Sequence, residues 1–320
     1  MPNHANFLGW EEQLHELQKT YNLQIESKES ALATLKKYAF HSLVQGYLPS
    51  LKDPKQPTRF MPGISIETLG VIQMLENRLS SELLQAIISI EKNMKALFQQ
   101  AISKELGTKE SDYLRPDPYL SWKTQRQQTL ALFLEKTKKS QQVSSDLHRH
   151  RQTGNVPPWV LVNEISFGQF MHWYMMSPLP VKRLVVADFT MPFTEERQRL
   201  DCFKEALGFL VSFRNGLAHG TLIGQIRSKA SLHYEQIQPF YEESVINLEE
   251  FTEGHGKRDF FGLLLVIGIF LKQSERQIFK DQLLNLLAIL DTLIPLNQMA
   301  MRQILGNAPL NLLERVEKIL

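Results

Sequence analysis

The sequence predicts an all-α protein, because apolar residues recur at helical spacing along most of the chain. The clearest stretch runs from near residue 66 to near residue 105, where apolar side chains step by three or four and no proline intervenes. Gly107 follows at the point where a helix would stop. No strong alternating pattern is visible, and residues 183–186 form only a short β-branched candidate for a strand. A bundle of helices is therefore the predicted architecture.

Further helices are expected wherever the apolar spacing continues between breaks. Ser27 is a candidate cap for one helix, and Thr194, followed by two glutamates, is a candidate start for another. Asn215-Gly216 is expected to weaken or end that second helix. Gly46 and four prolines up to residue 62 predict a loop, and the polar stretch 140–155 predicts a second. The expected helical segments are 11–21, 27–39, 66–105, 118–139, 160–174, 194–214, 260–271, 275–293 and 297–320.

The composition is that of an ordinary globular protein. Hydrophobic residues make up 43% and charged residues 22% of the 320 residues. The net charge of +2 is too small to indicate a nucleic-acid binder, so any RNA contact has to come from a local patch. The one cysteine, Cys202, cannot form an internal disulfide, and its apolar surroundings predict a small helix residue rather than a nucleophile.

The sequence also predicts a cytoplasmic protein without a membrane partner. The first ten residues have neither a basic leader nor an apolar stretch, so no signal peptide is expected. The longest apolar run, residues 260–271, is far shorter than the roughly 20 residues that span a bilayer. We expect three regions: an N-terminal helical region (1–62), a helical core with a basic loop near 136–156 (63–235), and a C-terminal helical extension (236–320).

The strongest candidate for a site is the pair Arg214 and His219, which have four residues between them at the end of an expected helix. RNA can be cleaved without a metal when its own 2′-hydroxyl attacks the neighbouring phosphate, which requires a base, an acid and nearby cations. Histidine suits the proton transfers because its unperturbed pKa of about 6.5 lies near physiological pH. Arginine suits the phosphate because its fork binds two oxygens and stays charged.

Two alternatives stand beside this interpretation. A second pair, Arg227 and His233, has similar spacing but lacks a comparable apolar helix face. In addition, Arg214 can simply pair with a neighbouring acid while His219 caps the helix. If the pair is catalytic, one chain supplies one histidine where two are needed. The hypothesis therefore includes a homodimer with both Arg214–His219 pairs facing one cleft, and it requires no cofactor and no metal.

A basic stretch before Pro157 is the candidate for gripping RNA phosphates. Its predicted contact residues are Lys138, Lys139, Arg149, His150 and Arg151. The alternative is an ordinary solvated loop. His148 and His150 lack a third metal ligand at a useful spacing. The aromatic residues Trp159, Phe167, Phe170 and Trp173 are expected in the core rather than stacked on bases.

Several segments, in order along residues 10–225, resemble the Abi-like (AbiD/AbiF-type) abortive infection proteins of the HEPN superfamily. They are Trp10 to Leu14 with Leu17, Phe40 to Tyr47 as a tyrosine-bearing turn, Arg78-Leu79 and Ile90-Glu91 on the long helix, Val156 to Val162 with Ser166 to Gly168, and Arg214 to Gly220 as Arg-Asn-x-x-Ala-His-Gly. The family often has an aspartate before the arginine of its central helix. Here Glu76-Asn77-Arg78 stands instead, so no role is carried over for that acid.

The resemblance implies a HEPN-like helical bundle with additional N- and C-terminal helices. It implies a metal-independent endoribonuclease, a toxin that shuts down phage-infected bacteria, with Arg214 and His219 catalytic and Asn215 supporting them. A neutralising antitoxin or a bound noncoding RNA is an expected partner. The alternative function is a non-catalytic RNA-binding or scaffold protein of a defence ribonucleoprotein, since fold alone does not establish activity.

Overall fold

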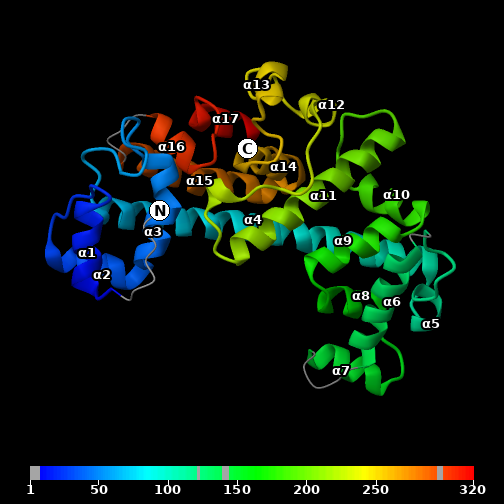
Figure 1. Cartoon of the computed structure of the whole chain (residues 1–320). Coiled ribbons are helices and arrows are strands. Elements are labelled where there is room, and N and C mark those ends of the chain that lie inside the picture. Colours follow the sequence, from blue (N-terminus) through cyan, green and yellow to red (C-terminus); the bar gives the residue numbers. More distant parts are fainter. Residues whose placement is uncertain (1–7, 121–122, 139–143, 294–297) are drawn as a thin grey trace.

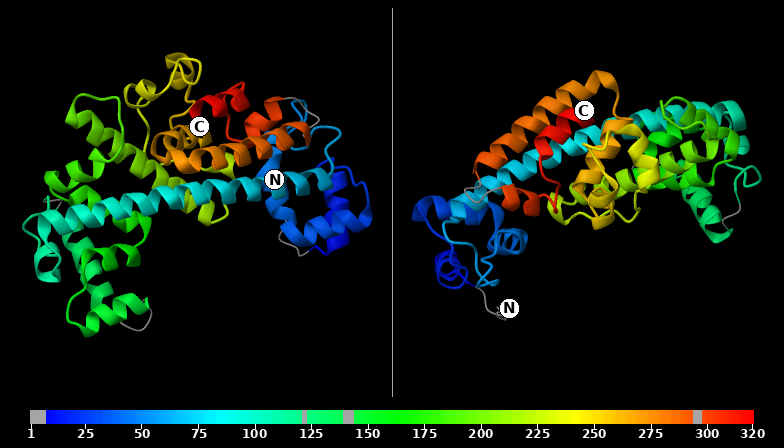
Figure 2. Two further views of the ribbon diagram at one scale, coloured as in Figure 1. Left: turned by 180° about the vertical axis from the view of Figure 1, so that it is seen from behind. Right: turned by 90° about the horizontal axis from the view of Figure 1, so that it is seen from above.

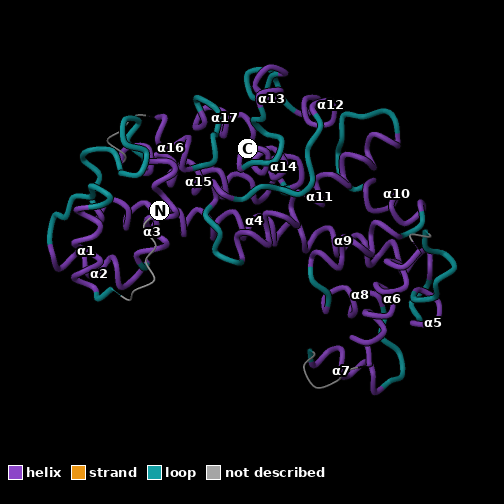
Figure 3. Tube along the Cα trace, viewed as in Figure 1, coloured by secondary structure: helices purple, strands orange, loops and turns teal. Residues whose placement is uncertain are grey.

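The computed structural model describes residues 8–120, 123–138, 144–293 and 298–320. Regular structure in these ranges is helical, and the remaining backbone pairing is limited to two isolated β-bridges, Gln24 with Ser65 and Lys52 with Phe60 (Figure 3). The predicted all-α class is confirmed. None of the helices in the described ranges combines the length and apolarity that a membrane span requires.

The helices follow one another with short connections. In chain order they are α1 (Trp10–Lys19), α2 (Lys28–Tyr38), α3 (Phe40–Leu51), α4 (Ile66–Leu106), α5 (Glu110–Tyr113), α6 (Lys123–Lys138), α7 (Ser145–Gln152), α8 (Pro158–Leu161), η1 (Val162–Glu164), α9 (Phe167–Met176), α10 (Leu179–Ala187), α11 (Glu196–Ala218), η2 (Ile223–Gln225), α12 (Tyr234–Ile237), η3 (Gln238–Phe240), α13 (Leu248–Glu253), α14 (Phe260–Phe270), α15 (Gln273–Leu293), α16 (Gln298–Ile304) and α17 (Leu312–Ile319).

Helix α4 is the axis of the molecule. Its 41 residues span about 60 Å at about 1.5 Å per residue. It begins where Ser65 Oγ accepts a hydrogen bond from Thr68 N and ends at Gly107, whose φ of +96° is a conformation that glycine adopts without strain. Both ends agree with the sequence prediction. Helices α1–α3 lie at one end of α4 and α5–α8 at the other (Figure 1), while α15 runs alongside it (Figure 2).

The buried side chains form one hydrophobic cluster that includes residues from all three expected regions. Phe98 of α4 packs edge to face on Phe170 and Trp173 of α9, at centroid distances of 5.3 and 5.1 Å. The core placement predicted for the aromatic residues is confirmed for Phe167, Phe170 and Trp173, whereas Trp159 is 43% exposed. Helix α14, the apolar run near residue 260, packs against α4, α11 and α17, so the C-terminal helices share this core.

The loop predicted from Gly46 onward is wrong for its first part, and so is the expected turn over residues 40–47. Both lie within α3, which buries Leu43, Val44, Tyr47 and Leu51 on one face. Pro49 near the end of α3 removes one backbone donor, and this burial outweighs that loss. Gly46 serves packing rather than a turn, because a Cβ there would come within 2.7 Å of Leu222 Cδ1.

The strand candidate at 183–186 is also wrong, since these residues belong to α10. Val181 and Val185 are both buried, and their spacing of four is helical. At the C-terminus the single segment expected over 297–320 divides into α16 and α17. Three residues with positive φ separate them, namely Gly306, Asn307 and Asn311, and glycine and asparagine are the types that tolerate this conformation best.

Helix α11 departs from prediction at both ends. Glu195 occupies the N-cap position without a side-chain cap, so Thr194 does not cap the helix. Asn215-Gly216 does not end it either, and the helix continues to Ala218. Gly216 lies where α11 meets the returning chain, since a Cβ there would come within 2.9 Å of Ile226. This close contact explains a glycine inside a helix, where it is otherwise unfavourable.

Candidate functional site

The Arg-x4-His motif forms the last turns of α11. His219 occupies the C-cap position, and its backbone N–H donates to Asn215 O at 3.1 Å. Gly220 follows with φ +71° and reverses the chain toward η2. The motif therefore lies between a long buried helix and a tight turn, which fixes the backbone on both sides of His219.

Arg214 faces the long helix α4. Its Nε lies 4.0 Å from Glu91 Oε2, and Glu91 also pairs with Lys95 at 2.8 Å. The Arg214 side chain is 35% exposed, whereas those of Glu91 and Lys95 are nearly buried. The guanidinium thus lies near an acid on α4, its Nε without a hydrogen-bond partner in the described chain, and the side chain still reaches solvent. This contact is the one that the structural alternative expected, in which Arg214 pairs with a neighbouring acid.

His219 has a different environment. Its side chain is exposed and lines a hollow of about 480 Å³ between α2, α3, α4 and the turn after α11. Within the described ranges the imidazole has no hydrogen-bond or ion-pair partner. A histidine without a structural partner, open to solvent at a concave surface, can exchange protons with a bound molecule.

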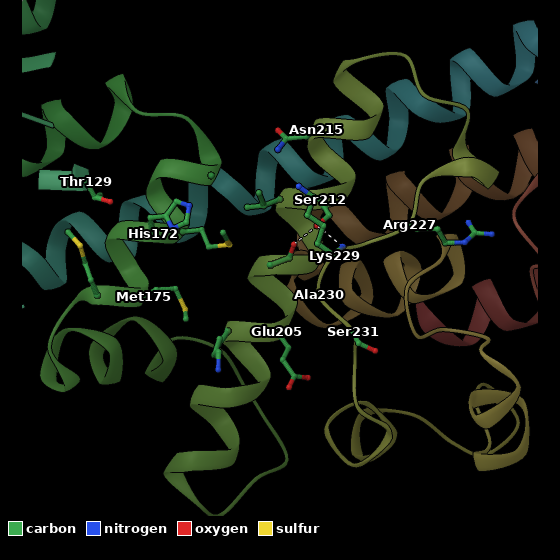
Figure 4. A pocket seen from close by; sticks show the side chains of 16 residues that line it. Thr129, His172, Met175, Glu205, Ser212, Asn215, Arg227, Lys229, Ala230 and Ser231 are labelled. Carbon is green, nitrogen blue, oxygen red and sulfur yellow. Dashed lines mark hydrogen bonds between the residues drawn. The ribbon is translucent and has the colours of Figure 1, made fainter. Parts of the chain in front are cut away.

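Asn215 lines a second and larger cavity, of about 850 Å³, on the other side of α11 (Figure 4). Its walls are α9, α11 and the segment 227–231. Figure 4 shows His172 and Met175 on the α9 side, and Lys229 against Ser212, whose Oγ accepts a hydrogen bond from Lys229 N at 3.3 Å. Asn215 is exposed at the edge of this cavity rather than in the hollow beside His219.

One chain does not bring the three predicted catalytic side chains into one pocket. His219 follows Arg214 by five positions. On a helix this offset corresponds to about 7.5 Å along the helix axis and about 140° around that axis. Arg214 accordingly points to α4, Asn215 to the large cavity and His219 to the smaller hollow. A site that uses an arginine and two histidines together requires a second copy of this surface.

A buried carboxyl that the sequence interpretation passed over supports the turn after His219. Glu76 Oε2 accepts a hydrogen bond from Tyr47 OH, and Oε1 accepts one from Ile223 N, both at 2.7 Å. Glu76 thereby joins α3, α4 and η2 at one point. Burial raises the pKa of Glu76 to about 7, although both hydrogen bonds favour the charged form and act in the opposite direction. The sequence does contain a signal for this buried position. Glu76 follows Ile72 by four residues, a spacing that places both side chains on the buried face of α4.

The second Arg–His pair is occupied by structural contacts. His233 Nδ1 lies 2.7 Å from Glu205 Oε1. Arg227 Nη1 donates to the carbonyl oxygens of Gly224 and Ile226, at 2.8 and 2.9 Å. Figure 4 shows the Arg227 side chain directed away from His172 and Asn215. These contacts favour Arg214–His219 over Arg227–His233.

The predicted basic loop is wrong in its conformation, because Arg149, His150 and Arg151 lie on α7. Ser144 caps this helix by accepting from Leu147 N, and the buried Leu147 anchors it. The acid Asp146 in the first turn and the basic residues in the last turn both suit the helix dipole. Lys138 ends α6, and its side chain, like all of Lys139, lies outside the described residues.

The charges on α7 are partly neutralised within the helix. Asp146 pairs with Arg149, and it lies 3.9 Å from His150 Nε2. Helix α7 packs on α6 and α8, at the opposite end of α4 from the helices that line the hollow beside His219 (Figure 1). Arg149, His150 and Arg151 are therefore not brought together with Arg214 and His219 in one chain.

Cys202 behaves as predicted for a small helix residue. It is 2% exposed, and burial raises the pKa of its thiol to about 12, so the thiol is not an activated nucleophile.

Comparison with known proteins gives one family. The sequence model of the family described as Abi-like protein matches residues 33–223, which include the whole Arg-x4-His motif and Glu76. No curated protein matches the chain. No solved structure matches it either.

Proposed function

The chain belongs to the Abi-like family, and on that premise we propose that it is a metal-independent endoribonuclease of the HEPN superfamily, of the AbiD/AbiF type. The family indicates a role in abortive infection, a form of defence against phage. The proposed toxin acts in the cytoplasm and cleaves RNA by attack of the 2′-hydroxyl on the adjacent phosphate. A HEPN-like core, a homodimer and control by an antitoxin or a noncoding RNA belong to the same proposal.

The observation that carries the proposal is the state of His219. Its imidazole is exposed, lines a hollow, and has no hydrogen-bond or ion-pair partner in the parts of the chain that the structure describes. Structural histidines in this chain differ from it, as His233 does in its contact with Glu205. A histidine that stabilises nothing visible in its own chain is a suitable general acid or base for a bound substrate.

The proposed reaction uses two His219 side chains, one from each subunit. One accepts the 2′-hydroxyl proton as the oxygen attacks phosphorus, and the other donates a proton to the departing 5′-oxygen. The products are a 2′,3′-cyclic phosphate and a 5′-hydroxyl. Arg214 stabilises the negative charge that accumulates on the phosphate oxygens, and Asn215 supports the site at the edge of α11. No step requires a metal or a cofactor.

The alternative is a non-catalytic RNA-binding or scaffold protein. The contact between Arg214 and Glu91 favours it, because it gives the arginine a structural task. Incubation of the purified protein with total RNA in EDTA separates the two. Cleavage that leaves cyclic-phosphate ends supports the endoribonuclease, and stable RNA co-purification without cleavage supports the alternative.

We propose that α7 contacts RNA phosphates away from the point of cleavage. Reversal of two charges, Arg149→Glu with Arg151→Glu, is expected to weaken RNA binding and to reduce the slope of log K against log salt by about 1.4, at about 0.7 per phosphate contact on single strands. Fluorescence anisotropy with a labelled RNA, in a His219→Ala background that excludes cleavage, measures both quantities.

The matched control is Arg197→Glu with Lys272→Glu, which makes an equal charge change at exposed residues outside α7. It is expected to leave the slope within error of the parent protein. Equal losses in the two double variants would show a general effect of net charge and would contradict a specific contact at α7.

A further inference from the structure

The hollow beside His219, which we call the His219 hollow, has a lining that suits a particular ligand. Its volume of about 480 Å³ lies within the range of about 300–1,000 Å³ that is usual for small-molecule sites. Beside His219 its side chains include Lys37, Tyr38, Gln45 and Gln73. In the described structure this lining contains a lysine, an aromatic ring and three amides, the third being Gln225, but no carboxylate, so it favours an anionic ligand with a polar planar group.

The cation and the ring lie next to each other. Lys37 Nζ is 4.9 Å from the centroid of the Tyr38 ring, and Lys37 forms no ion pair with any carboxylate of the described chain. Tyr38 is half-buried and packs against the hydrophobic core through part of its side chain. The ring is thus held in place, while the ammonium can exchange its weak contact with the ring for a stronger one with a phosphate.

The walls of the hollow are fixed by contacts between distant segments. Gly46 lets α3 approach Leu222, which forms part of the floor. Gln225 Nε2 reaches Gly46 O at 3.5 Å, and Glu76 holds Ile223 N from the other side. The hollow is therefore set by the same packing that fixes the turn after His219.

One amide has a defined orientation. Gln73 Nε2 donates to Asn77 Oδ1 at 3.0 Å, so this side chain can present its carbonyl oxygen to a donor on a ligand. Gln45 is exposed and carries both a donor and an acceptor. Amides of this kind pair with the edges of nucleobases that are not already paired.

We propose that the His219 hollow binds one unpaired nucleotide of an RNA strand, with its base on the Tyr38 ring and a phosphate at Lys37. Stacking on an aromatic ring requires a base that is free of its complement, so the ligand is single-stranded RNA or a loop rather than a duplex. We further place this nucleotide next to the bond that is cleaved, and that placement rests on the proposed function. The binding of the nucleotide in the hollow does not depend on the proposed function.

The test is binding of a fluorescein-labelled, random-sequence 12-nucleotide RNA, measured by anisotropy in the His219→Ala protein so that nothing is cleaved. Tyr38→Ala is expected to weaken binding about tenfold, because the base loses the aromatic ring on which it stacks. Tyr38→Phe keeps the ring and is expected to bind within about twofold of the parent. Lys37→Ala is expected to weaken binding and to lower the salt slope by about 0.7.

Lys36→Ala is the control for Lys37→Ala, because Lys36 is the adjacent exposed lysine on α2 and does not line the hollow. It is expected to bind as the parent does. A second measurement keeps the proposal open to contradiction if Tyr38→Ala does not fold. The same RNA carrying 4-thiouridine is expected to crosslink under ultraviolet light to the peptide that contains Tyr38.

The outcomes separate this inference from the proposed function. If wild-type protein does not cleave RNA but binding depends on Tyr38 and Lys37, the nucleotide site stands and the endoribonuclease does not. If cleavage depends on His219 while Tyr38→Ala and Lys37→Ala bind RNA as the parent does, the nucleotide site is overturned and the endoribonuclease stands. Crosslinks confined to α7 would also overturn the nucleotide site.

Discussion

Replacement of His219 by alanine is expected to reduce RNA cleavage by at least about 100-fold, because general acid–base catalysis contributes about 10²–10⁴-fold. The fold should survive, since the imidazole is exposed and has no partner among the described residues. Initial rates on a labelled RNA in EDTA measure the loss, and thermal unfolding checks the fold.

His233→Ala is the matched control, because His233 belongs to the competing Arg–His pair and contacts Glu205 at 2.7 Å. Its cleavage rate is expected to equal that of the wild type. A His219→Ala protein that cleaves RNA normally, or a His233→Ala protein that does not, would overturn the assignment.

Arg214→Ala belongs to the same prediction and is expected to abolish cleavage with little loss of stability. Glu91 keeps Lys95 at 2.8 Å when Arg214 is removed, so its charge is not left without a partner. Arg214→Lys keeps the charge but not the fork that binds two phosphate oxygens, and a partial loss is expected. If Arg214→Ala unfolds the protein, the arginine is structural and the alternative without catalysis gains support.

The second large effect concerns stability and pH. The pKa of Glu76 is about 7 in the folded protein, against an ordinary value near 4.5 when the chain is unfolded. Between these two values the folded state holds a proton that the unfolded state has released, so the free energy of unfolding falls as pH rises. The total loss is about 3 kcal/mol, at about 1.4 kcal/mol per pH unit, and it is complete above pH 7.

Glu76→Gln isolates this contribution, because glutamine does not titrate and can hydrogen bond with both Tyr47 and Ile223. Urea unfolding of both proteins at pH 5 and pH 8 is expected to show a larger loss in the wild type, with a difference of about 2.5 kcal/mol. The contributions of the other titrating groups to the pH dependence are the same in both proteins and cancel in this comparison. Equal pH dependence of the two proteins would show that Glu76 does not hold its proton in the folded state.

Local patterns in the sequence predicted the long elements of this fold. Helix α4 follows from an uninterrupted apolar stripe from near residue 66 to near residue 105, and Gly107 marks its C-terminal end in the sequence because a helix stop is a local signal. Cys202 as a buried helix residue follows from the same periodicity.

The errors arose where residues distant in sequence decide the structure. Gly46 and Gly216 were interpreted as breaks, yet both are inside helices and permit close contact with Leu222 and Ile226. The buried hydrogen bonds of Glu76 could not be predicted either, since Tyr47 and Ile223 come from other elements. Glycine and acidic residues have strong local preferences, and here tertiary packing outweighs those preferences.

The candidate site was predicted as a motif but not as an arrangement. The spacing of Arg214 and His219 identified the end of α11. It did not predict that Arg214 faces Glu91 while His219 faces a hollow built by α2 and α3. The orientations of these two side chains depend on which elements pack around α11, and a local sequence pattern does not predict that packing. The proposed mechanism completes the site with a second subunit, and this is its central claim.

A mixed dimer tests that claim most directly. Wild-type and His219→Ala chains with different tags are expressed together, and the heterodimer is purified through both tags. With one shared cleft and two required histidines, its cleavage rate is predicted to fall by at least about 100-fold. A dimer of two wild-type chains carrying the same tags keeps full activity. A mixed dimer with about half of that rate, or a protein that stays monomeric while it cleaves RNA, would contradict the shared site.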